Sequence, residues 1–333
     1  MDAALAHVAR RAALDAERSR AGVAGTLARY GRDAVDTSRA RVTLNFHPDR
    51  LRPDGVTVAE GLLHDGRYRS QFETGVTNGS PTAFTGGDRA RWEETLFGDA
   101  YRDGAERPKY GAFNVMAHSD GGSPRFGSCF VELVPAMLGR CSFTWGDSHA
   151  QPAHVGTASF FDGILAAWLD AIETTGAALG ASGLDVPGLL SRLADAAPRP
   201  AGRALDDYIE AQVHGPIELA RDVAVLVVDP SFAGTPTGTH LVALAARYGF
   251  AFRYHAGFAL RAAEVPPDFR GPRMRPLAER IAGDTLLDAA ALGRAARSIV
   301  ESPERWHDWG TPAATWQHIK QLWHVVVRFG HPA

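Results

Sequence analysis

The sequence predicts an α+β protein, with one mostly antiparallel sheet of about six strands and helices before, within and after it. Short runs rich in β-branched and aromatic residues recur between residues 41 and 256, separated by loops rich in glycine and proline. The apolar spacing typical of helices precedes this block at 2–30, interrupts it at 158–180 and dominates from 257 onward. We therefore expect a sheet with flanking helices, an N-terminal helix and a helical C-terminal extension.

The chain begins with a helix and a strand. Residues 2–30 are rich in alanine and arginine, with a helical pattern that ends at Tyr30-Gly31. RVTLNF (41–46) has the composition of a strand, and the proline of the following HPDR prevents its continuation as a central strand.

Two further helices are expected before the main block of strands. TVAEGLLHDG (57–66) predicts a short helix closed by Gly66, and DRARWEETLFG (88–98) predicts a helix with Asp88 as its N-cap. The stretch between them, 68–89, is rich in Gly, Thr, Ser and Asn, so we expect a long ordered loop or a broken strand pair.

Three strand patterns follow close together at 109–117, 125–134 and 140–146. The short loops HSDGGSP and PAMLG between them suggest sequential antiparallel neighbours. The strong apolar pattern at 158–180 and a second at 186–197 predict a helical insertion at about 158–205.

The last strands of the sheet are predicted at 208–219, 223–229 and 250–256, with a helix at 238–249 before the third. VAVLVVD (223–229) is a continuous apolar run, which fits a strand buried on both faces. The C-terminal segment carries a cluster of tryptophans that we interpret as the packing face of a docking helix: Trp306, Trp309, Trp316 and Trp323.

Composition places the chain among ordinary globular proteins. Of its 333 residues 45% are hydrophobic and 22% charged, and 35 Lys+Arg against 38 Asp+Glu give a net charge of −3. This balance carries no signature of general nucleic-acid or membrane binding. Cys129 and Cys141 lie in apolar strand patterns, so we expect buried free thiols. Without an apolar signal-peptide run or a window of 18 apolar residues, a cytoplasmic protein is expected, with export by a dedicated machine, as in some bacterial toxins, left open.

Polar residues gather at three strand positions. NFHPDR places His47 and Arg50 at the end of the first strand. PKYGAFN combines Tyr110 with a glycine inside a strand, which often marks close approach of a ligand, and with Asn114.

The third position is YIEAQVHGPIEL (208–219). Because residues i and i+2 of a strand point to the same side, Glu210, Gln212 and His214 share one face. Such a row is either a solvated edge or the floor of a site. Each of the three strand positions also has a structural interpretation: an ion-paired carboxylate for Glu210, packing for Tyr110 and a satisfied hydrogen-bonding residue for His47.

In this order, strand-His, strand-Tyr and strand-Glu resemble the His-Tyr-Glu arrangement of the ADP-ribosyltransferase fold. YIEAQVHGPIELARDVAVLVVD looks like the closing segment of the DarT-like enzymes. More broadly, the run from FHPDR through RPKYGAFN and GSPRFGSCFVEL to EAQVHGPI is similar to an uncharacterised bacterial family of unknown function, DUF3626, over about residues 40–255. That broader similarity brings no established activity with it.

The resemblance implies an ADP-ribosyltransferase-like catalytic core at 41–256, an N-terminal helical segment at 1–40 and a C-terminal extension at 257–333. It implies NAD as substrate and an unidentified acceptor, which could be a protein, a nucleic acid or a small molecule. Glu210 would hold the ribose and the developing positive charge, since nicotinamide leaves through an oxocarbenium-like transition state. The other implied site residues are His47 toward a ribose, Tyr110 stacked on nicotinamide, Arg50 on the pyrophosphate, and Asn114, Ser128 and Gln212 toward NAD.

Three alternatives stay open. The same site could hydrolyse NAD, or it could be a non-catalytic module that binds a nucleotide or peptide. The stretches TWGDSHAQPAHVGT and NVMAHSDGG could instead serve a metal-dependent hydrolase, although no HExxH or Cys-x-x-Cys spacing occurs and no metal ligand is predicted. The residues in question are Asp147, His149, His154, His118 and Asp120.

Overall fold

The computed structural model describes residues 2–76, 83–102, 106–195 and 199–333, and within them it has an eight-stranded, mostly antiparallel sheet. The strand order is β12-β11-β4-β1-β3-β9-β5-β6, and every neighbouring pair is antiparallel except β11 with β12. The strands are β1 Val42–Phe46, β3 Lys109–Phe113, β4 Cys129–Leu133, β5 Cys141–Trp145, β6 Val155–Thr157, β9 Ile209–Val213, β11 Val223–Val228 and β12 Ala251–Tyr254.

The predicted sheet is confirmed in kind but not in detail. The expectation of about six strands misses β6, which at three residues is too short to show a pattern. The expected sequential pairing of 109–117, 125–134 and 140–146 is wrong, because β1 lies between β3 and β4, and β1, β3 and β9 lie between β4 and β5. The chain turns away after Phe113: Ala117 has a left-handed backbone (φ 53°), and the Asn45 side chain donates to the carbonyls of Asp120 and Gly127, both at 3.2 Å.

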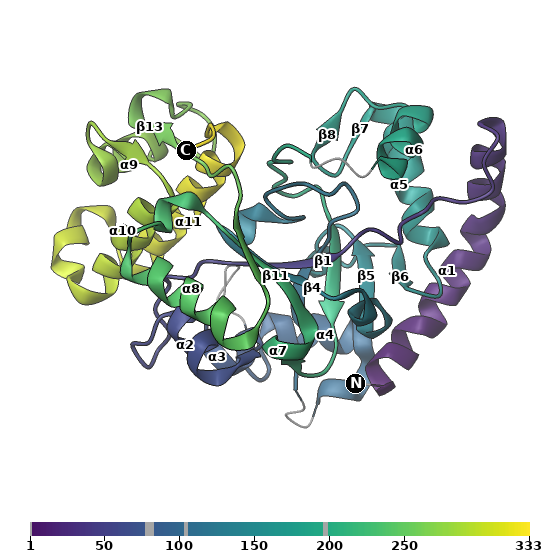
Figure 1. Ribbon diagram of the computed structural model, residues 1–333, viewed down its shortest axis with the longest axis horizontal. Helices are drawn as coiled ribbons and strands as arrows, with labels where there is room; N and C mark the ends of the chain where they lie inside the picture. Colours follow the sequence, from purple (N-terminus) through teal and green to yellow (C-terminus); the bar gives the residue numbers. More distant parts are fainter. Residues whose placement is uncertain (1, 77–82, 103–105, 196–198) are drawn as a thin grey trace.

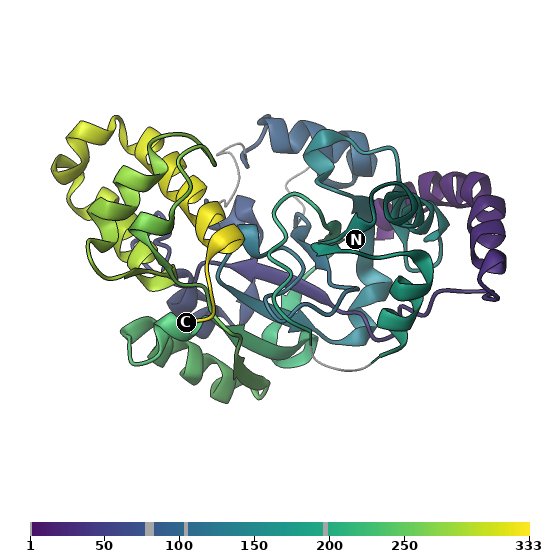
Figure 2. The same ribbon diagram turned by 90° about the horizontal axis from the view of Figure 1, so that it is seen from above.

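Helices cover the sheet on both sides, and the two ends of the chain lie far apart in the molecule (Figures 1 and 2). The N-terminal α1 packs on α5 and β6 at one end, and α9, α10 and α11 form a cluster at the other. The long helices are α1 Asp2–Arg29, α2 Val58–Asp65, α4 Asp88–Phe97, α5 Asp162–Thr175, α6 Val186–Ala194, α8 Pro236–Tyr248, α9 Met274–Ala282, α10 Ala289–Glu301 and α11 Pro312–Phe329.

Short elements complete the fold. The remaining α-helical turns are α3 Gln71–Thr74 and α7 Leu219–Asp222, and the 3₁₀ turns that matter for the site are η1 Gly98–Tyr101 and η2 Pro124–Phe126. Pairs of two-residue strands join β2 Arg67–Tyr68 to β10 Ile217–Glu218, β7 Ala177–Ala178 to β8 Ala181–Ser182, and β13 Leu260–Arg261 to β14 Leu286–Leu287.

Local signals set several helix ends as expected, with small shifts. Gly66 closes α2 with a left-handed backbone (φ 64°), and Thr57 opens that helix with a capping box. Gly87, not Asp88, is the N-cap of α4, so the carboxylate of Asp88 lies in the first turn. The stretch 68–89 contains α3 where a loop or strand pair was expected, and its residues 77–82 lie outside the described part.

The core runs through the middle of the sheet and reaches the C-terminal helices. All five residues of β1 and of β9 are buried, and Cys129 and Cys141 are buried free thiols as predicted. Trp323 of α11 donates its indole N–H to the carbonyl of Pro124 at 2.9 Å, which fixes this helix against η2. None of the helices described combines the length and the apolar character needed to cross a membrane.

Candidate functional site

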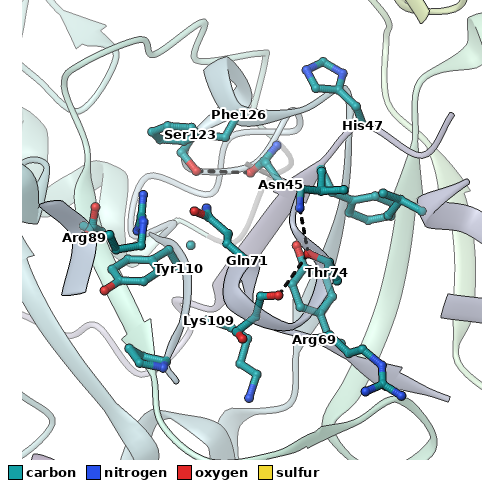
Figure 3. A pocket seen from close by; sticks show the side chains of 18 of the residues that line it. Asn45, His47, Arg69, Gln71, Thr74, Arg89, Lys109, Tyr110, Ser123 and Phe126 are labelled. Carbon is teal, nitrogen blue, oxygen red and sulfur yellow. Dashed lines mark hydrogen bonds between the residues drawn. The ribbon is translucent and has the colours of Figure 1, made fainter. Parts of the chain in front are cut away.

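A cavity of about 390 Å³ opens where the ends of β1, β3 and β9 meet α2, α3, α4 and α11 (Figure 3). Its wall combines apolar and charged side chains, and basic residues outnumber acidic ones, seven to four. The charged residues that line it are Arg52, Arg67, Arg69, Arg89, Lys109, Arg125 and Lys320 with Asp65, Asp88, Asp147 and Glu210.

Three predicted site residues, His47, Tyr110 and Glu210, all line this cavity. They come from segments that lie side by side, since β3 pairs with β1 on one side and with β9 on the other. Glu210 stands opposite Ala112 in this pairing, and Tyr110 stands opposite Gln212. Residues separated by more than 160 positions in the sequence are thus brought to one cavity by strand order.

Glu210 is a buried carboxylate, 5% exposed, at the floor of the cavity. Burial, and after it the nearby negative charge of Asp147, raise the pKa of its carboxyl from 4.5 to about 7. Gln212 donates to its Oε1 at 2.9 Å, which favours the charged form. The group therefore titrates near neutral pH, where a modest change in its surroundings changes its charge.

A buried chain of hydrogen bonds extends from Glu210 into the protein. Gln212 accepts from the Ser142 hydroxyl at 2.7 Å, Ser142 lies 2.9 Å from Nε2 of His214, and Nδ1 of His214 lies 2.5 Å from the hydroxyl of Tyr101. The polar row on β9 is thus not a solvated edge. Only Glu210 of this row lines the cavity, whereas Gln212 and His214 are buried behind it.

The direction of every bond in this chain follows from proton counting. The single hydroxyl proton of Ser142 goes to Gln212, so Ser142 must accept from a protonated Nε2 of His214. The Nδ1 atom is then an acceptor, and Tyr101 donates to it. Burial lowers the pKa of His214 to about 3, in agreement with this neutral ring. All donors point toward Glu210, an arrangement in which successive bonds polarise one another.

Tyr110 and Arg89 form a unit on another wall of the cavity, where they lie next to each other in Figure 3. The hydroxyl of Tyr110 donates to Glu93 at 2.7 Å, and Glu93 pairs with Arg107 at 2.6 Å. The guanidinium of Arg89 lies 4.6 Å from the ring centres of both Tyr110 and Trp92. Arg89 is only 8% exposed, and no carboxylate of the described residues lies within ion-pair distance of it.

His47 directly follows β1 and is partly buried in the cavity wall away from Tyr110 (Figure 3). Its ring meets that of Trp323 edge to face, with centroids 5.2 Å apart. Burial lowers its pKa to about 3, with a further contribution from Arg50, so the imidazole is neutral. A neutral ring offers one donor and one acceptor.

A model of proteins of unknown function, DUF3626, matches residues 41–329. The chain belongs to this family. The match includes the whole eight-stranded sheet, the cavity and α11, and it leaves out residues 1–40, which contain α1, and the last four residues. The search of curated proteins found no match to the chain.

Four other predicted NAD contacts do not reach the cavity lining of this DUF3626 protein. The side chain of Arg50 packs on the Trp316 ring at 4.4 Å, and Asn114 is held by two hydrogen bonds to the backbone of His118. Ser128 is buried, and Gln212 is fully enclosed as a bridge between Glu210 and Ser142. Packing occupies the guanidinium of Arg50, and internal hydrogen bonds occupy the amides of Asn114 and Gln212. The buried hydroxyl of Ser128 has no hydrogen-bond partner among the described residues.

The residues of the metal hypothesis are dispersed. Asp147 and His149 line the cavity, whereas His154 lies 3.3 Å from Asp15 of α1. His118 and Asp120 bind the backbone of other segments, Leu179 for the former and Gly202 and Arg203 for the latter. Within 2–76, 83–102, 106–195 and 199–333, no three His, Cys, Asp or Glu residues are grouped to hold a metal ion.

Arg89 and both lysines of the cavity were not predicted as site residues from the sequence. A composition signal could have found the lysines, because the chain has 35 basic residues and only two of them are lysine, Lys109 and Lys320. Both line the cavity. No such signal marks Arg89, because arginine is common in this chain and the residue pattern of its helix, α4, is that of an ordinary helix.

Proposed function

We propose that this protein binds NAD in the cavity and transfers its ADP-ribose group to an acceptor, with Glu210 as the catalytic carboxylate. The observation that carries the proposal is the convergence of Glu210, Tyr110 and His47, from three neighbouring strand segments, on one cavity large enough for part of a dinucleotide. The resemblance of these residues to the His-Tyr-Glu arrangement supplies the class of reaction.

The chemistry asks for a buried negative charge. When the bond between C1′ of the ribose and the nicotinamide nitrogen breaks, its electron pair leaves with nicotinamide and the ribose becomes an oxocarbenium-like cation. An ionised Glu210 would stabilise that cation and accept a hydrogen bond from the 2′-hydroxyl, and its stabilisation is greater in a site that excludes water. The acceptor then forms a bond to C1′ and loses a proton to solvent.

The basic wall suits the rest of NAD. Arg50 does not line the cavity, so we assign the pyrophosphate of NAD to basic side chains that do. Arg89 is one of them, and it has no carboxylate partner among the described residues. The rings of Tyr110 and Trp92 fix the plane of this guanidinium. A planar guanidinium binds phosphate oxygens with two parallel hydrogen bonds. The exposed face of Tyr110 would be left for nicotinamide.

The test compares Glu210→Gln with the parent and with a matched control, Glu132→Gln. Glu132 lies on β4 of the same sheet, outside the cavity lining, where it pairs with Arg253 at 3.6 Å. We expect Glu210→Gln to bind NAD with little change and to release nicotinamide at least a hundredfold more slowly, because the lost interaction belongs to the transition state. The control should match the parent. Equal turnover by all three proteins would refute the assignment of Glu210.

The fate of the ADP-ribose separates transfer from hydrolysis. With NAD labelled in the adenine, transfer predicts label on a macromolecule or small acceptor from a cell lysate. Free ADP-ribose as the sole product would make the protein an NAD glycohydrolase with the same site. Saturable NAD binding without nicotinamide release under any condition would indicate a binding module instead.

A further inference from the structure

Lys320 of α11 lines the cavity and adds a positive charge to it. This helix belongs to the C-terminal extension, to which the ADP-ribosyltransferase resemblance does not extend. It is half-buried, and no carboxylate or carbonyl of the described residues lies within hydrogen-bond distance of its ammonium group. Lys109, the other lysine of the chain, is by contrast paired with Glu106 and donates to the carbonyl of Gly215 at 3.1 Å. An ammonium group held away from water without a counter-charge is costly.

Two further cations lie beside Lys320. Arg125 of η2 lines the same wall, and Arg270 lies close behind it, so that both pair with one exposed carboxylate, Asp206. Their Nε atoms are buried without hydrogen-bond partners among the described residues. One turn beyond Lys320, His324 is 3% exposed, and both of its ring nitrogens also lack partners there.

These groups influence one another, as their proton affinities show. Burial, and after it the positive charges of Arg125, Arg50 and Arg270, lower the pKa of Lys320 from 10.5 to about 8, while Asp147 acts in the opposite direction. Burial and the same cationic surroundings lower the pKa of His324 to about 2. Two of the three cations, Arg125 and Arg270, thus share the carboxylate of Asp206, whose side chain is 65% exposed and therefore screened by water. The influence of Asp147 reaches Lys320 without an ion pair between them among the described residues.

The wall is held in place by the fold. The indole of Trp323 hydrogen-bonds Pro124 at 2.9 Å, and Pro124 immediately precedes Arg125, so α11 and η2 are tied together. The ring of Trp323 also contacts His47, which links this wall to the end of β1. A repulsive group of cations on a rigid support is an arrangement that a bound anion would stabilise.

We propose that Lys320 and Arg125 form a phosphate subsite on the α11 wall of the cavity, with Arg270 adding charge from behind. The ligand is a phosphate or pyrophosphate group, which has the charge and the oxygen acceptors that an ammonium and a guanidinium bind together. That group belongs either to NAD itself or to a phosphorylated acceptor. The subsite extends the proposed function and assigns a binding role to the C-terminal helices.

The experiment uses the small number of lysines. Protein labelled with ¹³C at lysine Cε gives two lysine signals, assigned with Lys109→Arg and Lys320→Arg, and is titrated with sodium pyrophosphate at constant ionic strength. We expect the Lys320 signal to shift in a saturable way and the Lys109 signal to stay in place. Sodium sulfate at equal ionic strength is the control for general anion effects.

Variants give the second measurement. Lys320→Gln should weaken pyrophosphate binding by about tenfold, measured by calorimetry, whereas Arg328→Gln, an exposed change in the last turn of the same helix, should leave it unchanged. No saturable Lys320 shift up to 10 mM pyrophosphate, or the same shift with sulfate, would refute the subsite.

Addition of NAD distinguishes the two sources of the phosphate. Competition between NAD and pyrophosphate assigns the subsite to the pyrophosphate of NAD, and simultaneous binding assigns it to a phosphate of the acceptor. Pyrophosphate binding by a protein that never releases nicotinamide would leave the subsite standing and overturn the proposed transfer reaction, so the two proposals fail separately.

Discussion

Replacing Ser142 with alanine should destabilise the protein strongly, although the change removes one oxygen atom. Ser142 is fully buried on β5, and its hydroxyl bonds Gln212 at 2.7 Å and His214 at 2.9 Å. Alanine leaves the carbonyl oxygen of Gln212 and the Nε2–H of His214 buried without those partners. Each such group costs about 1–3 kcal/mol, so we expect a loss of about 2–6 kcal/mol in the free energy of unfolding.

The assay is urea denaturation at pH 7, followed by circular dichroism. The midpoint should fall while the slope stays near that of the parent, since the surface exposed on unfolding does not change. Ser182→Ala is the matched control, because Ser182 is exposed on β8 and should change stability by less than about 0.5 kcal/mol. A loss below about 1 kcal/mol for Ser142→Ala would refute the hydrogen-bond chain that we infer behind Glu210.

Three further predictions concern the same region. The raised pKa of Glu210, about 7 instead of 4.5, means that folding favours the protonated carboxyl, so its stabilising effect is present below pH 4.5 and is lost as the pH rises through 7. In urea denaturation, the parent should lose stability relative to Glu210→Gln between pH 5 and pH 8. A difference in unfolding free energy between the two proteins that is the same at both pH values would contradict this. By ¹⁵N NMR, His214 should stay neutral with its proton on Nε2 at pH 5, and a charged ring at that pH would reverse our bond directions. Glu93→Gln should cost about 3 kcal/mol or more by leaving the buried Arg107 without its partner, whereas Glu301→Gln, from an exposed pair, should cost under about 0.5 kcal/mol; equal losses would contradict the argument.

Local sequence patterns predicted the elements of this fold better than their pairing. Strand composition located β1, β4, β9 and β11, and Gly66 ended α2 as expected. Pairing depends on contacts between distant segments, and no local signal could place β1 between β3 and β4. The short loops suggested hairpins, yet the buried side chain of Asn45 holds one of them in a path that returns the chain two strands away.

The candidate site shows the same division. Glu210, Tyr110 and His47 were chosen as polar residues at strand positions, and strand order brings them to one cavity. Alternation on β9 correctly put Gln212 on the side of Glu210, but it could not show that Ser142 of the neighbouring strand covers it. The cations of α4 and α11 were missed because they enter the cavity from helices, where tertiary packing alone decides which residues face inward.

The decisive measurement for the role of Glu210 is nicotinamide release from NAD by the purified protein. We expect the parent to release nicotinamide at neutral pH, with a rate that rises as the pH passes through about 7 and Glu210 becomes ionised. Glu210→Gln should release almost none under the same conditions. A folded parent that binds NAD and releases no nicotinamide between pH 6 and 9, with or without cell lysate, would show that Glu210 is not a catalytic carboxylate for this reaction.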